Sequence, residues 1–246
     1  MSRILGSILL VFLPLVTQAT GESLRWCKTG DETESLPVDR IRVLSLNISH
    51  GRNTAPNQLL VSKSKTYENL DRIAELLVDQ SPDVVALQEA DAASRWSGNF
   101  DHVAYLGEQA GLECGLHGLH SRTWISNYGT ALLSDTRPMV YASMPFAPSW
   151  PSKQKGFVWA TFDWTAGDQA RSITFVSVHL DFLRDKVRDS QIDEISAELA
   201  RIDGPLVVMG DFNSEWNDPA SQVKRLADEL DLYAYEPDKE GMGTYK

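Results

Sequence analysis

Four apolar segments of the sequence each end in side chains that can do chemistry. The first ends at Asn47, the second at Glu89, the third at His179, and the fourth at Asp211 and Asn213. A single acidic residue after a strand is ordinarily a turn former or a helix cap. Four such ends with complementary chemistry indicate a ligand site, because ligand sites gather at the carboxyl ends of strands in α/β sheets. We therefore expect these side chains to converge on one site.

The residue types at these ends favour a hard divalent cation. Glu89 and the Asp211/Asn213 pair offer oxygen ligands, which suit Mg²⁺ or Mn²⁺ better than zinc. His179 is a candidate donor to a phosphoryl oxygen. The five histidines do not predict a zinc site, because no two of them are four residues apart on a plausible helix.

The composition excludes several other classes of protein. The chain has 246 residues, 42% of them hydrophobic, which is typical of a folded protein and excludes a disordered acidic tail. With 23 Lys and Arg against 34 Asp and Glu, the formal net charge is −11, so the chain cannot hold a polyanion through bulk positive charge. It lacks the Gly-x-Ser-x-Gly motif of serine hydrolases. A bound divalent metal would reverse the local field if the substrate carries phosphate.

The first nineteen residues are typical of a secretory signal peptide (1–19). Arg3 precedes an apolar run, and the small residues Thr17 and Ala19 fit a cleavage site after Ala19. The run is shorter than the ~20 residues that span a bilayer, and the alternative interpretation is a buried helix or a membrane anchor. We expect export to the periplasm or to the outside of the cell. There, Cys27 and Cys114 either pair or stay as free buried thiols.

Helix and strand patterns alternate along the rest of the chain. Helices are predicted where apolar residues recur every three to four positions, over 66–80, around Ile192–Ile202 and over 219–230. Strands are predicted over 41–47, 82–88, 130–134, 157–164, 172–179 and 205–210. No repeat or linker interrupts the pattern, so we expect one domain over 39–246, preceded by a loose polar arm over 20–38. This mixture predicts an α/β sandwich in which helices cover sheets.

The strand-end motifs resemble those of the endonuclease/exonuclease/phosphatase superfamily, which includes pancreatic-type deoxyribonucleases and neutral sphingomyelinases. The resemblance runs from about Ile41 to Tyr245, and its motifs are Leu44–Ile48, Val84–Glu89, Tyr128–Ser134, Val178–Asp181 and Gly210–Asn213. It implies a four-layer α/β/β/α sandwich with two mixed β-sheets face to face. It also implies hydrolysis of a phosphoester with Mg²⁺ or Mn²⁺ as cofactor.

The resemblance gives each matching residue a role. Glu89 stands at the position of the principal metal ligand, and Asn47 at that of the asparagine beside it. His179 matches a histidine that stabilises phosphoryl oxygens. Asp211 matches the residue that orients the attacking water, and Asn213 matches a contact to the phosphate.

Three further residues, Arg95, Tyr128 and Asp181, match motif positions and are candidates for substrate binding. Each has an alternative interpretation. Arg95 is also consistent with a surface salt bridge, Tyr128 with a packed ring, and Asp181 with hydrogen bonding at a strand end. These alternatives stay open on the sequence alone.

The sequence departs from the family pattern after Gly243–Tyr245. Family members continue into an Arg-Ile-Asp strand and a final Ser-Asp-His motif, whose histidine acts as general base or acid, whereas this chain ends at Lys246. The resemblance therefore implies a fragment that lacks the last strands of its sheet and has little activity of its own. The alternative is a binding protein that kept the fold and lost turnover.

The substrate stays open among a nucleic acid, a phospholipid headgroup and a small phosphodiester. A sphingomyelinase-like lipid phosphodiesterase would expose an apolar rim, and Met144–Pro151 is either such a rim or a loop packed on the core. We expect a monomer with no stable protein partner.

Overall fold

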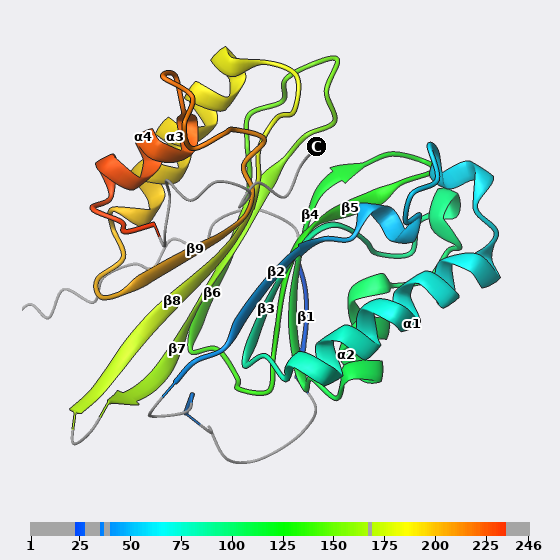
Figure 1. Cartoon of the computed structure of the whole chain (residues 1–246), viewed down its shortest axis with the longest axis horizontal. Coiled ribbons are helices and arrows are strands. Elements are labelled where there is room, and N and C mark those ends of the chain that lie inside the picture. Colours follow the sequence, from blue (N-terminus) through cyan, green and yellow to red (C-terminus); the bar gives the residue numbers. More distant parts are fainter. Residues whose placement is uncertain (1–22, 28–34, 37–39, 167–168, 235–246) are drawn as a thin grey trace, which may run out of the picture.

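A computed structural model of the chain describes residues 23–27, 35–36, 40–166 and 169–234. Two β-sheets lie face to face, and a pair of helices covers the outer face of each sheet (Figure 1). The predicted α/β sandwich with two mixed sheets is confirmed. The predicted signal peptide and the Gly243–Tyr245 motif lie outside the described residues. Within those residues, no helix is long and apolar enough to cross a membrane.

The first sheet has five strands in the order β1-β4-β5-β3-β2. Their bounds are Ser23–Cys27 for β1, Val43–Asn47 for β2, Val84–Asp91 for β3, Cys114–Arg122 for β4 and Asn127–Ser134 for β5. Only β2 and β3 pair in parallel in this sheet, and the helix α1 (Lys63–Gln80) makes the crossover that a parallel pair requires. The helix α2 (His102–Ala110) packs beside α1 on the same face (Figure 1).

The second sheet repeats this plan with four strands in the order β6-β7-β8-β9. Their bounds are Val140–Pro145 for β6, Gly156–Ala166 for β7, Gln169–His179 for β8 and Leu206–Asp211 for β9. The parallel pair is β8 and β9, joined by the helix α3 (Asp185–Leu199), and the helix α4 (Gln222–Glu229) packs against α3. Within residues 40–166, the short 3-10 helices η1 (Ser49–Gly51), η2 (Gln58–Leu60) and η3 (Arg95–Ser97) lie in loops between the larger elements.

Strand β3 shows how the sequence divides the core into layers. Successive side chains of a strand point to opposite faces. Val85 and Leu87 pack in the cluster beneath α1 and α2, whereas Val84 and Ala86 pack in the cluster between the two sheets. Both faces of β3 are therefore buried, which explains its continuous apolar run.

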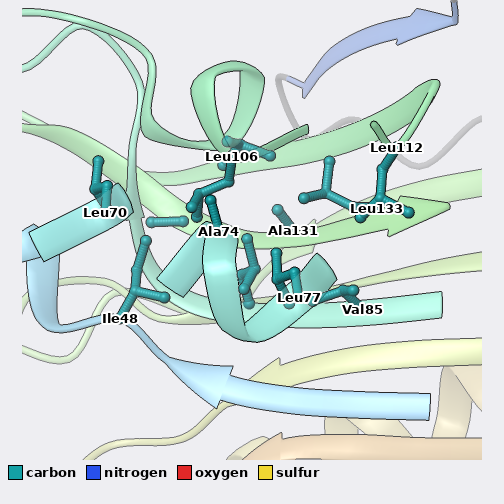
Figure 2. Close-up of a cluster of buried hydrophobic side chains, with 12 residues drawn as sticks. Ile48, Leu70, Ala74, Leu77, Val85, Leu106, Leu112, Ala131 and Leu133 are labelled. Atoms are coloured by element: carbon teal, nitrogen blue, oxygen red, sulfur yellow. The ribbon is translucent and has the colours of Figure 1, made fainter. Parts of the chain in front are cut away.

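The outer layer of the first sheet depends on one face of α1. Leu70, Ala74 and Leu77, spaced by four and three residues, lie over the sheet in a fully apolar cluster (Figure 2). Ser62 caps the helix by accepting a hydrogen bond from the amide of Lys65, and the left-handed Ser81 ends it. On the second sheet, Ile192, Ile195 and Leu199 of α3 play the same part. Each sheet is thus held to its helices by an amphipathic stripe.

Strand β1 lies within the segment predicted as a loose polar arm, and the structure differs from that prediction. Ser23–Cys27 pair antiparallel with β4, and Cys27 forms a disulfide with Cys114, its direct partner in the register. Trp26 packs against the first core cluster, and Gly115 leaves space for its ring, since a Cβ there would lie 2.2 Å from it. These long-range contacts stabilise a segment whose alternation of polar and apolar residues covers only five positions.

Candidate functional site

The carboxyl ends of the two parallel strand pairs meet at one place, where β2 and β9 lie in contact across the sandwich (Figure 1). Asn47, the last residue of β2, donates a hydrogen bond from Nδ2 to Oδ2 of Asp211, the last residue of β9, over 2.8 Å. His179, which ends β8, lies with Nε2 3.7 Å from the same oxygen. Three of the residues predicted to form the site therefore lie together.

A buried polar bridge fixes the two sheets beneath these residues. Gln88 donates from Nε2 to Oγ of Ser177 over 3.1 Å, and the Ser177 hydroxyl donates to the carbonyl oxygen of Leu87 over 3.0 Å. Buried hydrogen bonds of this kind hold a single geometry, because breaking one leaves an unsatisfied polar group. The bridge sets the distance between the two halves of the site.

The backbone at the strand ends adopts an uncommon conformation. His50, Glu89 and Asn213 have φ angles of 55°, 49° and 47°, in the left-handed region that is unfavourable for residues with a side chain. At Glu89 the register between β3 and β5 also shifts, between Leu87 and Ala90. Such conformations cost about 1–3 kcal/mol each and cluster at functional sites. At Glu89 this conformation interrupts the alternation of β3, whereas His50 and Asn213 lie just past the ends of β2 and β9.

Asp211 is held in one orientation by its neighbours. Oδ2 accepts the hydrogen bond from Asn47, and Oδ1 accepts one from the backbone amide of Asn213 over 3.1 Å. The Asn213 side chain in turn donates from Nδ2 to the carbonyl oxygen of Leu180 over 3.1 Å. The Asp211 side chain is still 30% exposed. It is therefore a fixed carboxylate that water can reach.

Lys155 lies inside the site, and the sequence analysis did not identify it. Its Nζ is 3.1 Å and 3.3 Å from the two ring nitrogens of His179, and 3.9 Å from Oε1 of Glu89. Burial lowers the pKa of Lys155, while the charges of Glu89 and Asp211 act in the opposite direction. Burial and the charge of Lys155 lower the pKa of His179 well below its usual value. His179 is therefore a neutral imidazole at neutral pH, beside a buried amine.

The position of Lys155 follows from strand pairing rather than from a motif. Gly156 pairs with His179 in the antiparallel register of β7 and β8, which places the preceding residue beside the end of β8. The only signal in the sequence was a Lys-Gly step before an apolar run. Without the register, that step is indistinguishable from an ordinary loop.

His50 and Asp91 are also at the site without a predicted role. His50 donates from Nδ1 to Oδ2 of Asp91 over 2.8 Å, and its Nε2 lies 3.5 Å from Oε2 of Glu89. Burial alone would raise the pKa of Asp91, but hydrogen bonds from His50 and Ser94 and the charges of His50 and His102 together outweigh burial and lower it. Asp91 is therefore a buried carboxylate, and His50 and Trp96 both donate to it over 2.8 Å.

The three residues predicted to bind substrate have different positions. Tyr128 is buried, its ring meets that of His50 edge-on at 4.6 Å, and burial raises the pKa of its phenol. Asp181 is fully buried, and its carboxylate accepts hydrogen bonds from the backbone amides of Leu183 and Arg184, so it holds a loop rather than facing substrate. Arg95 is exposed on η3, and no residue among those described forms an ion pair with it.

The donor set fits Mg²⁺ or Mn²⁺. Mg²⁺ commonly binds proteins through one or two carboxylates and keeps several waters. The side chain of Glu89 is 18% exposed and provides such a carboxylate at the site. Both polar atoms of the Asn47 side chain already form hydrogen bonds, since Oδ1 accepts from the amide of Ser49 over 2.9 Å and Nδ2 donates to Asp211. Oδ1 keeps a second lone pair that can bind a metal. No cluster of three acidic, histidine or cysteine side chains suited to a metal occurs in the described part of the chain.

Comparison with solved structures identifies the fold. An endonuclease/exonuclease/phosphatase family protein from Leptotrichia buccalis is similar with a TM-score of 0.56 and 18% identity, covering 77% of this chain and 74% of that one. The human Nocturnin catalytic domain with bound sulfate has a TM-score of 0.56 and 20% identity, covering 81% and 73%. A mannosyl-6-phosphatase of Bacteroides thetaiotaomicron has a TM-score of 0.52 and 16% identity, covering 78% and 70%.

Comparison with curated proteins finds no match. The sequence profile described as "Endonuclease/Exonuclease/phosphatase family" matches residues 44–241, which include all the strand ends that form the site. The match covers most of the chain and agrees with the two-sheet fold. The chain therefore belongs to the endonuclease/exonuclease/phosphatase family of metal-dependent phosphoesterases.

Proposed function

We propose that the chain is a Mg²⁺- or Mn²⁺-dependent hydrolase of phosphoester bonds. The observation that carries the proposal is the meeting of two partly exposed carboxylates, those of Glu89 and Asp211, with several hydrogen-bond donors at a single edge of the sandwich. Glu89 lies 3.9 Å from Lys155, which contacts His179, and His179 lies 3.7 Å from Asp211. Such a set holds a cation and an anion side by side, as a metal-assisted reaction at phosphate requires.

Each side chain at the site has a separate role in the proposed hydrolysis. A metal held by Glu89 would supply positive charge against a phosphate oxygen. Lys155, His179 and Asn213 are donors for the other oxygens, where negative charge grows in the transition state. Asp211, fixed by Asn47, accepts a hydrogen bond from the attacking water and so orients it. These local groups explain how a chain of net charge −11 can bind an anionic substrate.

Hydrolysis of two simple substrates tests the proposal. Purified chain is assayed on bis-p-nitrophenyl phosphate and on p-nitrophenyl phosphate, with Mg²⁺, with Mn²⁺ and with a chelator. We expect metal-dependent release of nitrophenol that the chelator abolishes and that His179→Ala reduces by about 10²-fold or more. Binding of phosphate and metal without turnover would support the alternative interpretation, that the chain is a binding protein that kept the fold and lost catalysis. Turnover that the chelator leaves unchanged would contradict the proposal.

A lipid phosphodiester is the second candidate substrate, and an exposed apolar rim favours it. Within the predicted rim Met144–Pro151, Trp150 is 88% exposed and Phe146 is buried. Phe182 and Leu183, which lie after β8, are 57% and 55% exposed. Arg184 joins these loops, since it donates to the carbonyl oxygen of Trp150 over 3.0 Å. The Phe182 ring lies 5.9 Å from Nζ of Lys155, which places the rim beside the donors.

Vesicles separate this second candidate from soluble phosphodiesters. We expect a lipid phosphodiesterase to hydrolyse sphingomyelin or phosphatidylcholine in vesicles faster than a short-chain analogue of the same headgroup. Trp150→Ala and Phe182→Ala should remove that preference while leaving hydrolysis of bis-p-nitrophenyl phosphate intact. Equal rates on both forms of the lipid would exclude the lipid surface as the substrate.

Export is proposed on the sequence of residues 1–19, and the disulfide between Cys27 and Cys114 supports it. Structural disulfides persist in oxidising compartments and are rare in the cytosol. Mass spectrometry of the protein from its host should therefore find an amino terminus near Thr20. An intact Met1 on a cytoplasmic protein with reduced cysteines would contradict export.

A further inference from the structure

Asp91 and His50 form a buried pair directly behind Glu89. Asp91 is fully buried at the end of β3, and both of its oxygens are engaged. Oδ2 accepts from Nδ1 of His50 over 2.8 Å, and Oδ1 accepts from Nε1 of Trp96 over 2.8 Å. Because an ionised carboxylate only accepts, both ring nitrogens of His50 act as donors, Nδ1 toward Asp91 and Nε2 toward Glu89 on the opposite side of the ring.

The His50 ring is fixed in its orientation by its surroundings. It lies 4.9 Å from the Trp96 ring and 4.6 Å from the Tyr128 ring, which contact it from two directions. The backbone beside it is also anchored, because Asn69 donates from Nδ2 to the carbonyl oxygen of Gly51 over 2.9 Å. A Cβ at Gly51 would lie 2.8 Å from Thr66, so this tight turn requires glycine.

The fixed ring points its free edge at the metal-binding carboxylate. Nε2 of His50 lies 3.5 Å from Oε2 of Glu89, and Nζ of Lys155 lies 3.9 Å from the other oxygen, Oε1. The Glu89 backbone is in the left-handed region, so its side chain leaves the strand alternation and needs neighbours that define its direction. His50 is the nearer of the two polar neighbours.

We propose that the Asp91–His50 pair is a positioning device that holds the Glu89 carboxylate in the orientation that binds the divalent cation. The inference rests on the proposed function, because it takes Glu89 as the metal ligand. Neither Asp91 nor His50 touches substrate in this account, and both act through Glu89. Partners that orient metal ligands commonly change metal affinity by about 10–100-fold when they are replaced.

Direct metal binding by the whole chain tests this inference without relying on turnover. Isothermal titration calorimetry with Mn²⁺ gives the dissociation constant for the natural chain and for His50→Gln, with circular dichroism to show that each protein is folded. We expect His50→Gln to weaken Mn²⁺ binding by about 10–100-fold. Asp91→Asn keeps the size of the side chain but removes its charge and one of its two acceptor oxygens, so it should weaken binding at the lower end of that range.

Trp96→Phe is the matched control, because it removes the other hydrogen bond to Asp91 and keeps a ring against His50. It should lower thermal stability as a buried hydrogen bond is lost, yet change the Mn²⁺ dissociation constant less than threefold. A purely structural pair would make all three variants alike, with lower melting temperatures and unchanged Mn²⁺ affinity, and that result would overturn the inference. Tighter Mn²⁺ binding in His50→Gln would also overturn it, since His50 would then act only as a competing cation.

Glu89→Gln distinguishes failure of this inference from failure of the proposed function. If Glu89→Gln loses Mn²⁺ binding while folded His50→Gln and Asp91→Asn bind normally, the positioning role is wrong and the metal site stands. If Glu89→Gln binds Mn²⁺ as the natural chain does, Glu89 is not the ligand, and both proposals are wrong. If His50→Gln does not fold, the Mn²⁺ dissociation constant of Asp91→Asn alone tests the positioning role.

Discussion

The two parallel strand pairs of the molecule have the same plan and opposite chemistry. In the unit β2–α1–β3 the strand ends carry the carboxylates of Glu89 and Asp91. In the unit β8–α3–β9 the corresponding ends carry the donors of His179 and Asn213, with Lys155 beside them. The first unit is therefore suited to a cation and the second to an anion. The fold brings these two kinds of site into contact by placing one strand end against another.

Asn47, the last residue of β2, and Asp211, the last residue of β9, break this division, and they bind each other. Asn47 is the amide in the acidic unit, and Asp211 is the carboxylate in the donor unit. The hydrogen bond of 2.8 Å between them crosses from one sheet to the other. It ties the position of the cation to that of the water-orienting carboxylate, so a metal and a phosphate bound in the two units would meet at a fixed distance.

Breaking the acidic unit should have the largest effect. Glu89→Gln removes the carboxylate that binds the metal, and a metal contributes several kcal/mol to a phosphoryl transition state, so we expect hydrolysis to fall by about 10³-fold or more. The matched control is Glu75→Gln on the exposed face of α1, which should behave as the natural chain does. Steady-state rates on bis-p-nitrophenyl phosphate with saturating Mg²⁺ measure both. Residual activity within tenfold of the natural rate would remove Glu89 from the metal site.

Breaking the donor unit should cost less and leave the metal site intact. Asn213→Ala removes one donor to the transition state, which is commonly worth about 10²–10³-fold in kcat. Because Asn213 does not contact Glu89, the concentration of Mg²⁺ that gives half-maximal rate should stay the same. A large rise in that concentration would show that the two units are not separate in function.

The two sheets also differ in what stabilises them, because the disulfide joins strands of the first sheet. It links Cys27 of β1 to Cys114 of β4 across 87 residues of sequence. Replacing both cysteines with serine should lower the free energy of unfolding by about 2–4 kcal/mol. Urea unfolding of the two proteins at equal pH measures the difference. Coincident unfolding curves would mean that β1 contributes little to the folded state.

Acid should act mainly on the first half of the molecule, where three buried histidines lie on α2 and β4. Burial lowers the pKa of His120 to about 3, and it also lowers the pKa of His102 and His117. Their contribution to stability is therefore complete above the unfolded pKa of about 6.5 and is lost as the pH falls below it, by up to about 1.4 kcal/mol per pH unit for each histidine.

Urea unfolding at pH 7.5 and pH 5.5 tests this expectation. His120→Gln, which can keep a hydrogen bond to Thr130, should lose less stability between the two pH values than the natural chain. An equal loss in both proteins would show that His120 does not take up a proton on unfolding in this range.

The sequence predicted the parts of the site that strand ends define. The continuous apolar run before Glu89 and the apolar strand before His179 are strong local signals, and the order of the motifs identifies the family. Lys155 could not be found in this way, because its place depends on the register between β7 and β8. The contact of His50 with Asp91 likewise depends on the pairing of β2 with β3, since the two residues are 41 positions apart in the sequence. The strand β1 was missed because an alternation over five residues is a weak signal and because its stability comes from Cys114 and the core.

Separate binding of the two ligands tests the division of the site most directly. Calorimetric titrations with Mn²⁺ alone and with inorganic phosphate alone are made on the natural chain, on Glu89→Gln and on Asn213→Ala. We expect Glu89→Gln to lose Mn²⁺ binding and to keep its affinity for phosphate within threefold. We expect Asn213→Ala to keep Mn²⁺ binding and to bind phosphate about tenfold more weakly, because one charge-assisted hydrogen bond is lost. If both variants lose both ligands equally, the two units form a single undivided site and the account is contradicted.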